Sequence, residues 1–323
     1  MTLAEPAQVQ GPGGTPGEPG ERGERGTPVA PGERGERGTP GEHGSHRTLL
    51  GSLWHNSNGR TGLVLVGLVV LAAIAGALGA TPYPAQAQNP LATLKSPSFS
   101  HPLGTDQFGR DLFSLVLQGL YISLKISCVA VAIAGVIGTV AGVVAGYLGR
   151  WTAGIIMRVT DMLFAIPAIL FALAIVTALG PGWMNSALAI GIGYIPIFVR
   201  VVRGPVLALR EAGYVRAGRV LGFSRTRLLF RHILPNVAGI VAVQTSLALA
   251  WSVLAEASLS FLGLGPPPPT ASLGEMVSQS SSLAATAWWT LAAPSVAIVI
   301  AVIGFNFLGD GLRDAVDPRA RAR

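Results

Sequence analysis

Six long apolar runs constrain this chain more than any other feature of its sequence. The first, residues 61–80, contains no charged side chain. A helix rises about 1.5 Å per residue, so a run of this length crosses the hydrocarbon core of a bilayer. We therefore predict an all-α integral membrane protein with six transmembrane helices. The other five spans are expected at about 126–148, 162–180, 186–202, 236–258 and 288–308.

Composition excludes several other classes of protein. Half of the 323 residues are hydrophobic and only 12% are charged, which is about half the share in a soluble domain. The net charge of +7 comes from arginines between the apolar runs, so we read it as membrane topology and expect no nucleic-acid binding. Cys128 is the only cysteine, so it builds neither a disulfide framework nor a metal site.

The first 60 residues have a different character. Glycine occurs at every third position from Gly11 to Gly44, interrupted once at Val29. Gly-X-Y with proline is typical of collagen, because only glycine fits the axis of three wound chains. The tract is short and polar, however, and buries too little apolar area to fold alone. We predict a disordered low-complexity tail over 1–60, with a trimeric stalk as the alternative.

The transmembrane domain is expected over 61–323, with its first span at 61–80 and its core spans within 119–308. A cleaved signal peptide is the competing interpretation of 61–80, but a leader of 60 residues is too long for one. With the amino terminus in the cytoplasm, segments 149–158, 200–235 and 309–323 lie on the cytoplasmic side. Beyond residue 60 these segments hold every arginine except Arg110. The positive-inside rule therefore predicts that both termini are cytoplasmic.

Small residues in the second span predict a close helix contact. Gly138, Gly142 and Gly146 are spaced by four residues, just over one helical turn, so they form a stripe on one face. Such stripes let another helix approach closely in lipid. A flexible hinge is the alternative.

Few charges lie near the apolar runs. Arg158 and Asp161 are three residues apart at the start of the third span, so we expect an ion pair on one helix face. Glu256 lies towards the outer end of the fifth span, before the run Pro266 to Pro269 that ends the helix. Ionisable groups within a membrane are candidates for a transport pathway. For Glu256, substrate contact and a packing role both remain open.

The cytoplasmic segment 200–235 has a helix–glycine–helix pattern. Pro205 fits the first position of a helix, and Gly222 fits the position just after its end. Ser224 fits the N-cap of a second short helix, Arg225 to Leu234, which Pro235 would close.

The first of these helices is expected to be amphipathic. Arg216 and Arg219 lie across from an apolar face. That face comprises Leu207, Tyr214, Gly218 and Leu221. An elbow of this kind is suited to docking on another protein, while a basic segment resting on anionic lipid is the alternative.

Residues 214–222, Tyr-Val-Arg-Ala-Gly-Arg-Val-Leu-Gly, and 232–236, His-Ile-Leu-Pro-Asn, resemble the "EAA" loop of ATP-binding-cassette (ABC) importer permeases. That loop carries Glu-Ala-Ala, then a glycine four residues after the second alanine, and later Leu-Pro. Gly222 and Leu234-Pro235 hold the corresponding places. Arg216 replaces the glutamate and Gly218 replaces the second alanine.

Further segments are similar to the dipeptide/oligopeptide (and nickel) transport family, in the second-permease type. The resemblance covers about 61–318, and several motifs in the same order make it specific. The segments are 101–106 (His-Pro-Leu-Gly-Thr-Asp), 109–111 (Gly-Arg-Asp), 157–161 (Met-Arg-Val-Thr-Asp), 179–182 (Leu-Gly-Pro-Gly) and 256–265 (Glu-Ala-Ser-Leu-Ser-Phe-Leu-Gly-Leu-Gly).

This resemblance implies a type I importer architecture in the bacterial cytoplasmic (inner) membrane. Two permeases would bind two ATP-binding subunits and receive solute from an extracytoplasmic substrate-binding protein. Peptides are the implied solute, and they would pass between this chain and the second permease. The loop 203–235 would couple the spans to an ATPase. Its coupling residues would be Leu207, Tyr214, Ala217, Gly218, Leu221, Gly222, Leu234 and Pro235.

The chain has no G-x-x-x-x-G-K-[ST] phosphate loop. We therefore expect no enzyme activity and no cofactor in this chain, with ATP and Mg²⁺ bound by partner subunits. Alternatives are a permease for nickel or another small solute, or an ion-coupled secondary transporter. The latter is expected to have ionisable groups near the membrane midplane, whereas Asp161 and Glu256 lie near span ends. A membrane hydrolase is disfavoured because H-E-x-x-H and G-x-S-x-G are absent.

Overall fold

The structure is a computed structural model that describes residues 51, 53–54 and 56–316. The collagen-like tract lies outside the described residues, so the prediction of a disordered tail is not tested there. The described residues belong to one compact unit. This unit is built from helices, and its only extended pairing among the described residues is an isolated bridge between Thr105 and Asp111.

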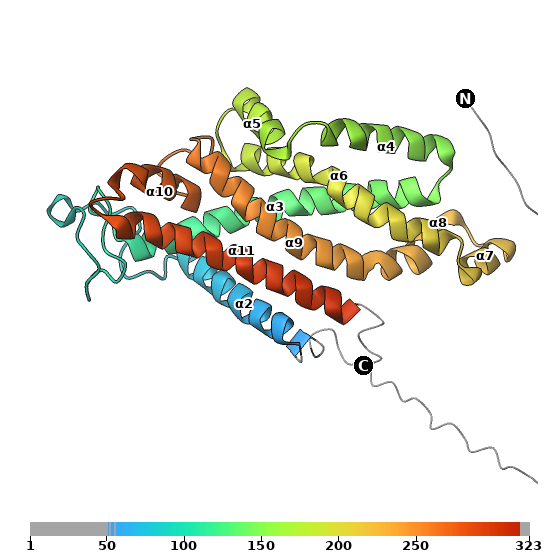
Figure 1. The fold of residues 1–323 in the computed structure, drawn as a ribbon, viewed down its shortest axis with the longest axis horizontal. Coiled ribbons are helices and arrows are strands. Elements are labelled where there is room, and N and C mark those ends of the chain that lie inside the picture. Colours follow the sequence, from blue (N-terminus) through green and yellow to red (C-terminus); the bar gives the residue numbers. More distant parts are fainter. Residues whose placement is uncertain (1–50, 52, 55, 317–323) are drawn as a thin grey trace, which may run out of the picture. The chain divides into compact units, whose positions relative to one another are not determined.

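Long helices pack side by side along the molecule (Figure 1). Among the described residues, five of them are long and apolar enough to cross a membrane, and a bent pair would make a sixth span. The helices are α2 (Ser57–Ala77), α3 (Leu112–Tyr147), α4 (Arg150–Phe164), α5 (Ala168–Leu179), α6 (Trp183–Arg210), α7 (Gly213–Val220), α8 (Arg225–Leu228), α9 (Leu234–Phe261), α10 (Leu273–Ser280) and α11 (Trp288–Val316). A five-residue π turn, η2 (Leu229–Ile233), joins α8 to α9, and short 3₁₀ turns lie at Pro90–Ala92 and Ser281–Leu283.

The straight span predicted at 162–180 is wrong. Helix α4 ends at Phe164, α5 begins at Ala168, and the two meet at an angle of 86°. Pro167 occupies the N-cap of α5. Proline lacks an amide donor and pushes the preceding residue out of the helical region, so the helix breaks here.

The glycine stripe of α3 packs against α6, as predicted. A Cβ atom on Gly138 would clash with Phe198, and one on Gly146 would clash with Val206. Gly142 faces Val202 in the same way. The stripe is therefore a packing surface that brings two spans into close contact.

A second close crossing joins the first and last spans. Gly62 of α2 lies against the backbone of Leu308 in α11, and Gly311 of α11 lies against Gly59. Val69 of α2 is buried in the largest core cluster, with residues of α3, α9 and α11. The first span is thus part of the packed bundle.

One end of the bundle, at the left of Figure 1, carries α10 and the segment between α2 and α3. We call residues 81–111 together with α10 the cap. Asp111 caps helix α3 through a hydrogen bond from the Ser114 amide (2.9 Å), and its carboxylate also lies 2.9 Å from His101 Nδ1. Asp106 accepts hydrogen bonds from the amide (2.8 Å) and Nε (2.6 Å) of Arg110. The motif at 101–111 therefore builds the start of α3.

Candidate functional site: the elbow and the clasp

The opposite end of the bundle carries the turn between α6 and α9. We call residues 211–233 the elbow. Figure 1 shows α7 beyond the ends of α3, α6 and α9, at the tip of the molecule. The elbow contains most of the coupling residues expected from the sequence.

The prediction that a helix begins at Pro205 is wrong. Helix α6 continues through Pro205 to Arg210. Val202 and Val206, on either side of this proline, are fully buried against the glycine stripe of α3. This packing holds the helix together despite the missing amide donor. The chain leaves α6 only at Ala212, whose backbone is extended.

The break separates Leu207 from the other residues of the expected apolar face. Leu207 lies on α6, while α7 is a separate helix of eight residues. Its buried side chains are Val215 and Gly218, whereas Tyr214 and Leu221 are 48% and 73% exposed. The single apolar face predicted over 205–222 is therefore wrong, because the two helices have different axes.

The inner side of α7 belongs to a small core. Val215 packs with Val206 of α6, Leu228 of α8 and Ile233 of η2. Gly218 faces Leu228 and the ring of Phe223, which leave little room for a side chain. This core fixes which side of α7 faces outward.

Gly222 ends α7, as predicted, with a positive φ of +76°. Its amide donates to the carbonyl of Arg219 (3.0 Å), and the Phe223 amide donates to that of Gly218 (2.9 Å). These two bonds form a Schellman motif. A Cβ atom here would meet no neighbour, so the backbone angle alone favours glycine.

Ser224 caps α8 as predicted, through a hydrogen bond from the Arg227 amide (3.2 Å). The prediction that Pro235 closes this helix is wrong. The π turn follows α8, and Pro235 lies in the first turn of α9. The π turn just before it shifts the backbone hydrogen-bond pattern, so the helical run tolerates the amide donor that proline lacks. The helical run therefore continues from Arg225 to Phe261.

The elbow has few carboxylates to balance its arginines. Glu211 pairs with Arg210 (3.1 Å) and Arg216 (3.0 Å). Hydrogen bonds from Arg210 and then Arg216 lower the pKa of Glu211. Arg219 donates to the carbonyl of Arg210 (3.1 Å), and its guanidinium lies over the Tyr147 ring.

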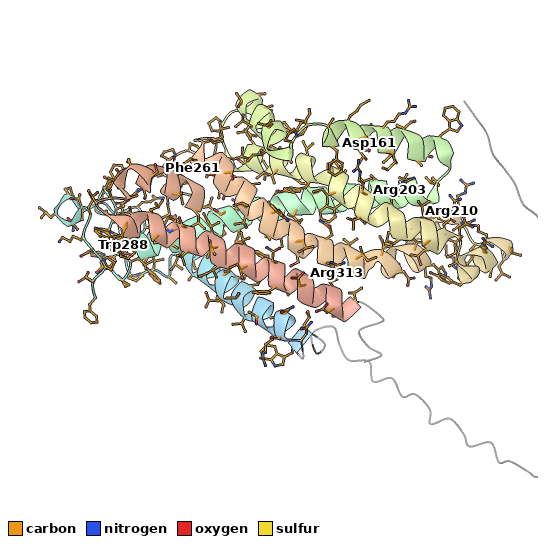
Figure 2. All side chains as sticks on the ribbon, viewed as in Figure 1. Asp161, Arg203, Arg210, Phe261, Trp288 and Arg313 are labelled. Carbon is orange, nitrogen blue, oxygen red and sulfur yellow. The ribbon has the colours of Figure 1, made fainter. Side chains whose placement is uncertain are left out.

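The ion pair expected between Arg158 and Asp161 is wrong. Asp161 instead pairs with Arg200 of α6 (2.7 Å), and both side chains are about half exposed. Arg200 also lies 4.1 Å from the ring centre of Phe164. Figure 2 labels Asp161 and Arg203, which lie on this side of the bundle. The pair connects α4 to α6, because the bend after Phe164 places α4 beside α6.

Glu256 lies at the cap end and is fully buried. The Ser260 hydroxyl donates to its Oε1 (2.7 Å), and the side chains of Ser123 and Ser272 face the same carboxyl group. We call these four residues the clasp. Ser123 also accepts a hydrogen bond from the Leu273 amide (3.4 Å). The clasp therefore connects α3, α9 and the first residues of α10, and this burial supports a packing role for Glu256.

Glu275 of α10 lies nearby. Burial raises its pKa, while the charge of Arg110 opposes that shift. Gln279 donates to its Oε1 (2.9 Å).

Sequence reasoning missed several of these side chains. Ser123 is a polar side chain within a largely apolar helix, which could have signalled a polar contact inside the bundle. Glu211 is the only carboxylate in 205–235 and was therefore the available partner for the arginines. Nothing in the local sequence marked Arg200 as the partner of Asp161, because that contact depends on the bend.

Comparisons with known proteins agree with this architecture. Residues 138–322 match the family described as binding-protein-dependent transport system inner membrane component. The matched region includes the elbow, Glu256 and α11. Members of such a system work with a binding protein and an ATPase.

Relatives are similar over most of the chain. The dipeptide transport system permease protein of Alkalihalophilus pseudofirmus is 40% identical over 260 residues, covering 80% of this chain and 85% of the relative. A glutathione transport system permease protein of Pectobacterium atrosepticum is 41% identical over 263 residues, covering 80% and 87%. The probable D,D-dipeptide transport system permease protein of Escherichia coli is 43% identical over 229 residues, covering 71% and 77%. The chain therefore belongs to the inner-membrane components of binding-protein-dependent transport systems, as a permease and not as the ATPase.

Proposed function

We propose that this chain is one of two permeases in an ABC importer for short peptides. The relatives above are named for dipeptides, D,D-dipeptides and glutathione, all of which are short peptides. The chain would form half of a solute path in a type I arrangement, with α4 and α5 together as its sixth span. Membrane lipid would cover the outer surface of α2.

The proposed assembly contains a second permease, two ATP-binding subunits and an extracytoplasmic binding protein. ATP and Mg²⁺ would be held by the ATP-binding subunits. The positive-inside rule favours a cytoplasmic elbow, because the segment 200–235 that contains it holds eight of the arginines beyond residue 60, whereas the segment between α2 and α3 holds only Arg110. Both termini would then be cytoplasmic and the cap would face the binding protein.

The exposed side of α7 is the observation that carries the coupling role. Tyr214, Ala217 and Leu221 are exposed at the tip of the molecule, although two of them are large and apolar. Apolar side chains gathered on a protruding helix mark a contact with another protein. A groove that received this helix would move it together with α9, since one helical run joins the elbow to the clasp.

Substitution of Gly222 tests this role. Gly222→Val forces a β-branched residue into a left-handed backbone conformation, at a cost of about 1–2 kcal/mol. We expect peptide uptake into proteoliposomes to fall at least tenfold while ATP hydrolysis continues and membrane insertion is unchanged.

Gly213→Ala is the matched control. Gly213 lies in the first turn of α7, and a Cβ atom there meets no neighbour. This variant should transport normally. Normal uptake by Gly222→Val would contradict the coupling role.

A further inference from the structure

Arg216 lies on the outer side of α7. Val215 and Gly218 face inward, so in a helix of 3.6 residues per turn Arg216 and Val220 fall on the opposite side. Val220 is 89% exposed, and the Arg216 side chain is 64% exposed. Any surface that covers α7 must therefore accommodate a guanidinium beside apolar side chains.

The elbow has a large excess of positive charge. Residues 205–235 contain six arginines and one glutamate, and they are Arg210, Arg216, Arg219, Arg225, Arg227, Arg231 and Glu211. Glu211 is shared between two of these arginines. It cannot neutralise the others, so the elbow stays positive when Arg216 is paired.

Covering Arg216 without a new partner would be costly. A guanidinium that loses water is stabilised only if a carboxylate or comparable acceptor replaces that water. Arginine suits such a contact because its planar fork binds a carboxylate through two hydrogen bonds. The hydrogen bond to Glu211 already restrains the guanidinium and orients it along α7.

We propose that the surface receiving α7 is an acidic groove on an ATP-binding subunit, with a carboxylate that pairs with Arg216. This inference rests on the proposed function above and adds the chemistry of the partner.

Anionic lipid is the other possible counter-charge. The position of α7 beyond the ends of α3, α6 and α9 (Figure 1) favours a protein in place of the bilayer surface.

The experiment measures binding of the ATPase subunits that copurify with the wild-type chain. The full-length permease pair is placed in nanodiscs, and affinity is measured over a range of NaCl concentrations. We expect Arg216→Glu to weaken binding at least about tenfold at low salt, because like charges across an interface repel strongly. Arg216→Gln should weaken it about threefold, and both differences should shrink as salt screens the charges.

Arg313→Glu is the matched control, because it makes the same change of charge on α11, away from α7 (Figure 2). It should bind as the wild type does. Unchanged affinity in Arg216→Glu would overturn the acidic groove. If Gly222→Val still uncoupled transport in that case, the coupling role would stand and only the charge inference would fail.

Nanodiscs of phosphatidylcholine and of phosphatidylglycerol separate the two counter-charges. A loss of affinity in Arg216→Glu that appears in both lipids supports a carboxylate on the ATPase. A loss confined to phosphatidylglycerol would assign the counter-charge to lipid and overturn the proposal.

Discussion

The clasp and the elbow both place a glutamate among polar partners, but with opposite surroundings. Glu256 is fully buried, accepts a hydrogen bond from Ser260, and lies close to Ser123 and Ser272 from two other segments of the chain. Glu211 lies on the surface between Arg210 and Arg216, which are close to it in the sequence. The first glutamate connects distant parts of the sequence, whereas the second organises only the elbow.

This contrast separates stability from recognition. Buried polar groups must be satisfied within the chain, because water cannot replace a lost partner. Exposed ion pairs contribute little to folding, because water and salt compete with them. The clasp is therefore expected to hold the cap on the bundle, and the elbow to keep a surface ready for a partner.

Removal of the clasp carboxyl should have the largest effect on folding. Glu256→Ala removes the acceptor of the Ser260 hydroxyl and leaves a cavity between α3, α9 and α10, and we expect it to lower the free energy of unfolding by about 3 kcal/mol. Denaturant titration in detergent micelles measures this change. Glu256→Gln keeps the shape and one acceptor oxygen, so it should cost about 1 kcal/mol. If the alanine variant were as stable as the wild type, the clasp would not stabilise the fold, and the proposed difference between the clasp and the elbow would be wrong.

Two neighbouring residues of α7, Gly218 and Ala217, separate stability from recognition within the elbow. Gly218→Leu would press on Leu228 and Phe223 and should destabilise the elbow by about 2 kcal/mol. Trypsin should then cut at the elbow arginines at least tenfold faster, since about 1.4 kcal/mol corresponds to a factor of ten. Ala217→Leu, on the exposed side, should leave the cleavage rate unchanged. Equal rates for the two variants would show that the assignment of inner and outer sides is wrong.

The smallest effect is a pH dependence at the cap. Burial raises the pKa of Glu275, so the folded protein favours its protonated form. The resulting stabilisation is present below the ordinary carboxyl pKa of 4.5 and is lost as pH rises through the raised value. Glu275→Gln removes this dependence, so the wild type should lose thermal stability relative to the variant as pH rises above 4.5. A parallel pH course for the two proteins would contradict the shift.

Local periodicity and local helix-end chemistry explain which sequence predictions hold. The stripe of Gly138, Gly142 and Gly146 was readable because one helical period places the three glycines on the same face. Gly222 and Ser224 were readable because helix ends have local chemistry. The structure confirms that the three glycines face α6, that Gly222 ends α7 and that Ser224 caps α8.

Predictions fail where distant segments decide the local structure. Pro205 signals a helix start, but packing of its neighbours on α3 carries the helix through it. Asp161 has Arg158 three residues away, but the bend at Pro167 places α4 beside α6, where Asp161 pairs with Arg200 instead. Both outcomes depend on contact with a distant segment, which is α3 for Pro205 and α6 for Asp161.

The π turn at Leu229–Ile233 has a consequence for chain length. A π turn carries one more residue than an α turn, and each residue added to or removed from a helix rotates one flanking segment against the other by about 100°. A further residue inserted here has no second bulge to absorb it and would turn α7 away from the direction that its partner must meet. The number of residues between Gly222 and Leu234 therefore sets the direction of α7. Insertions in this loop should be tolerated far less than substitutions.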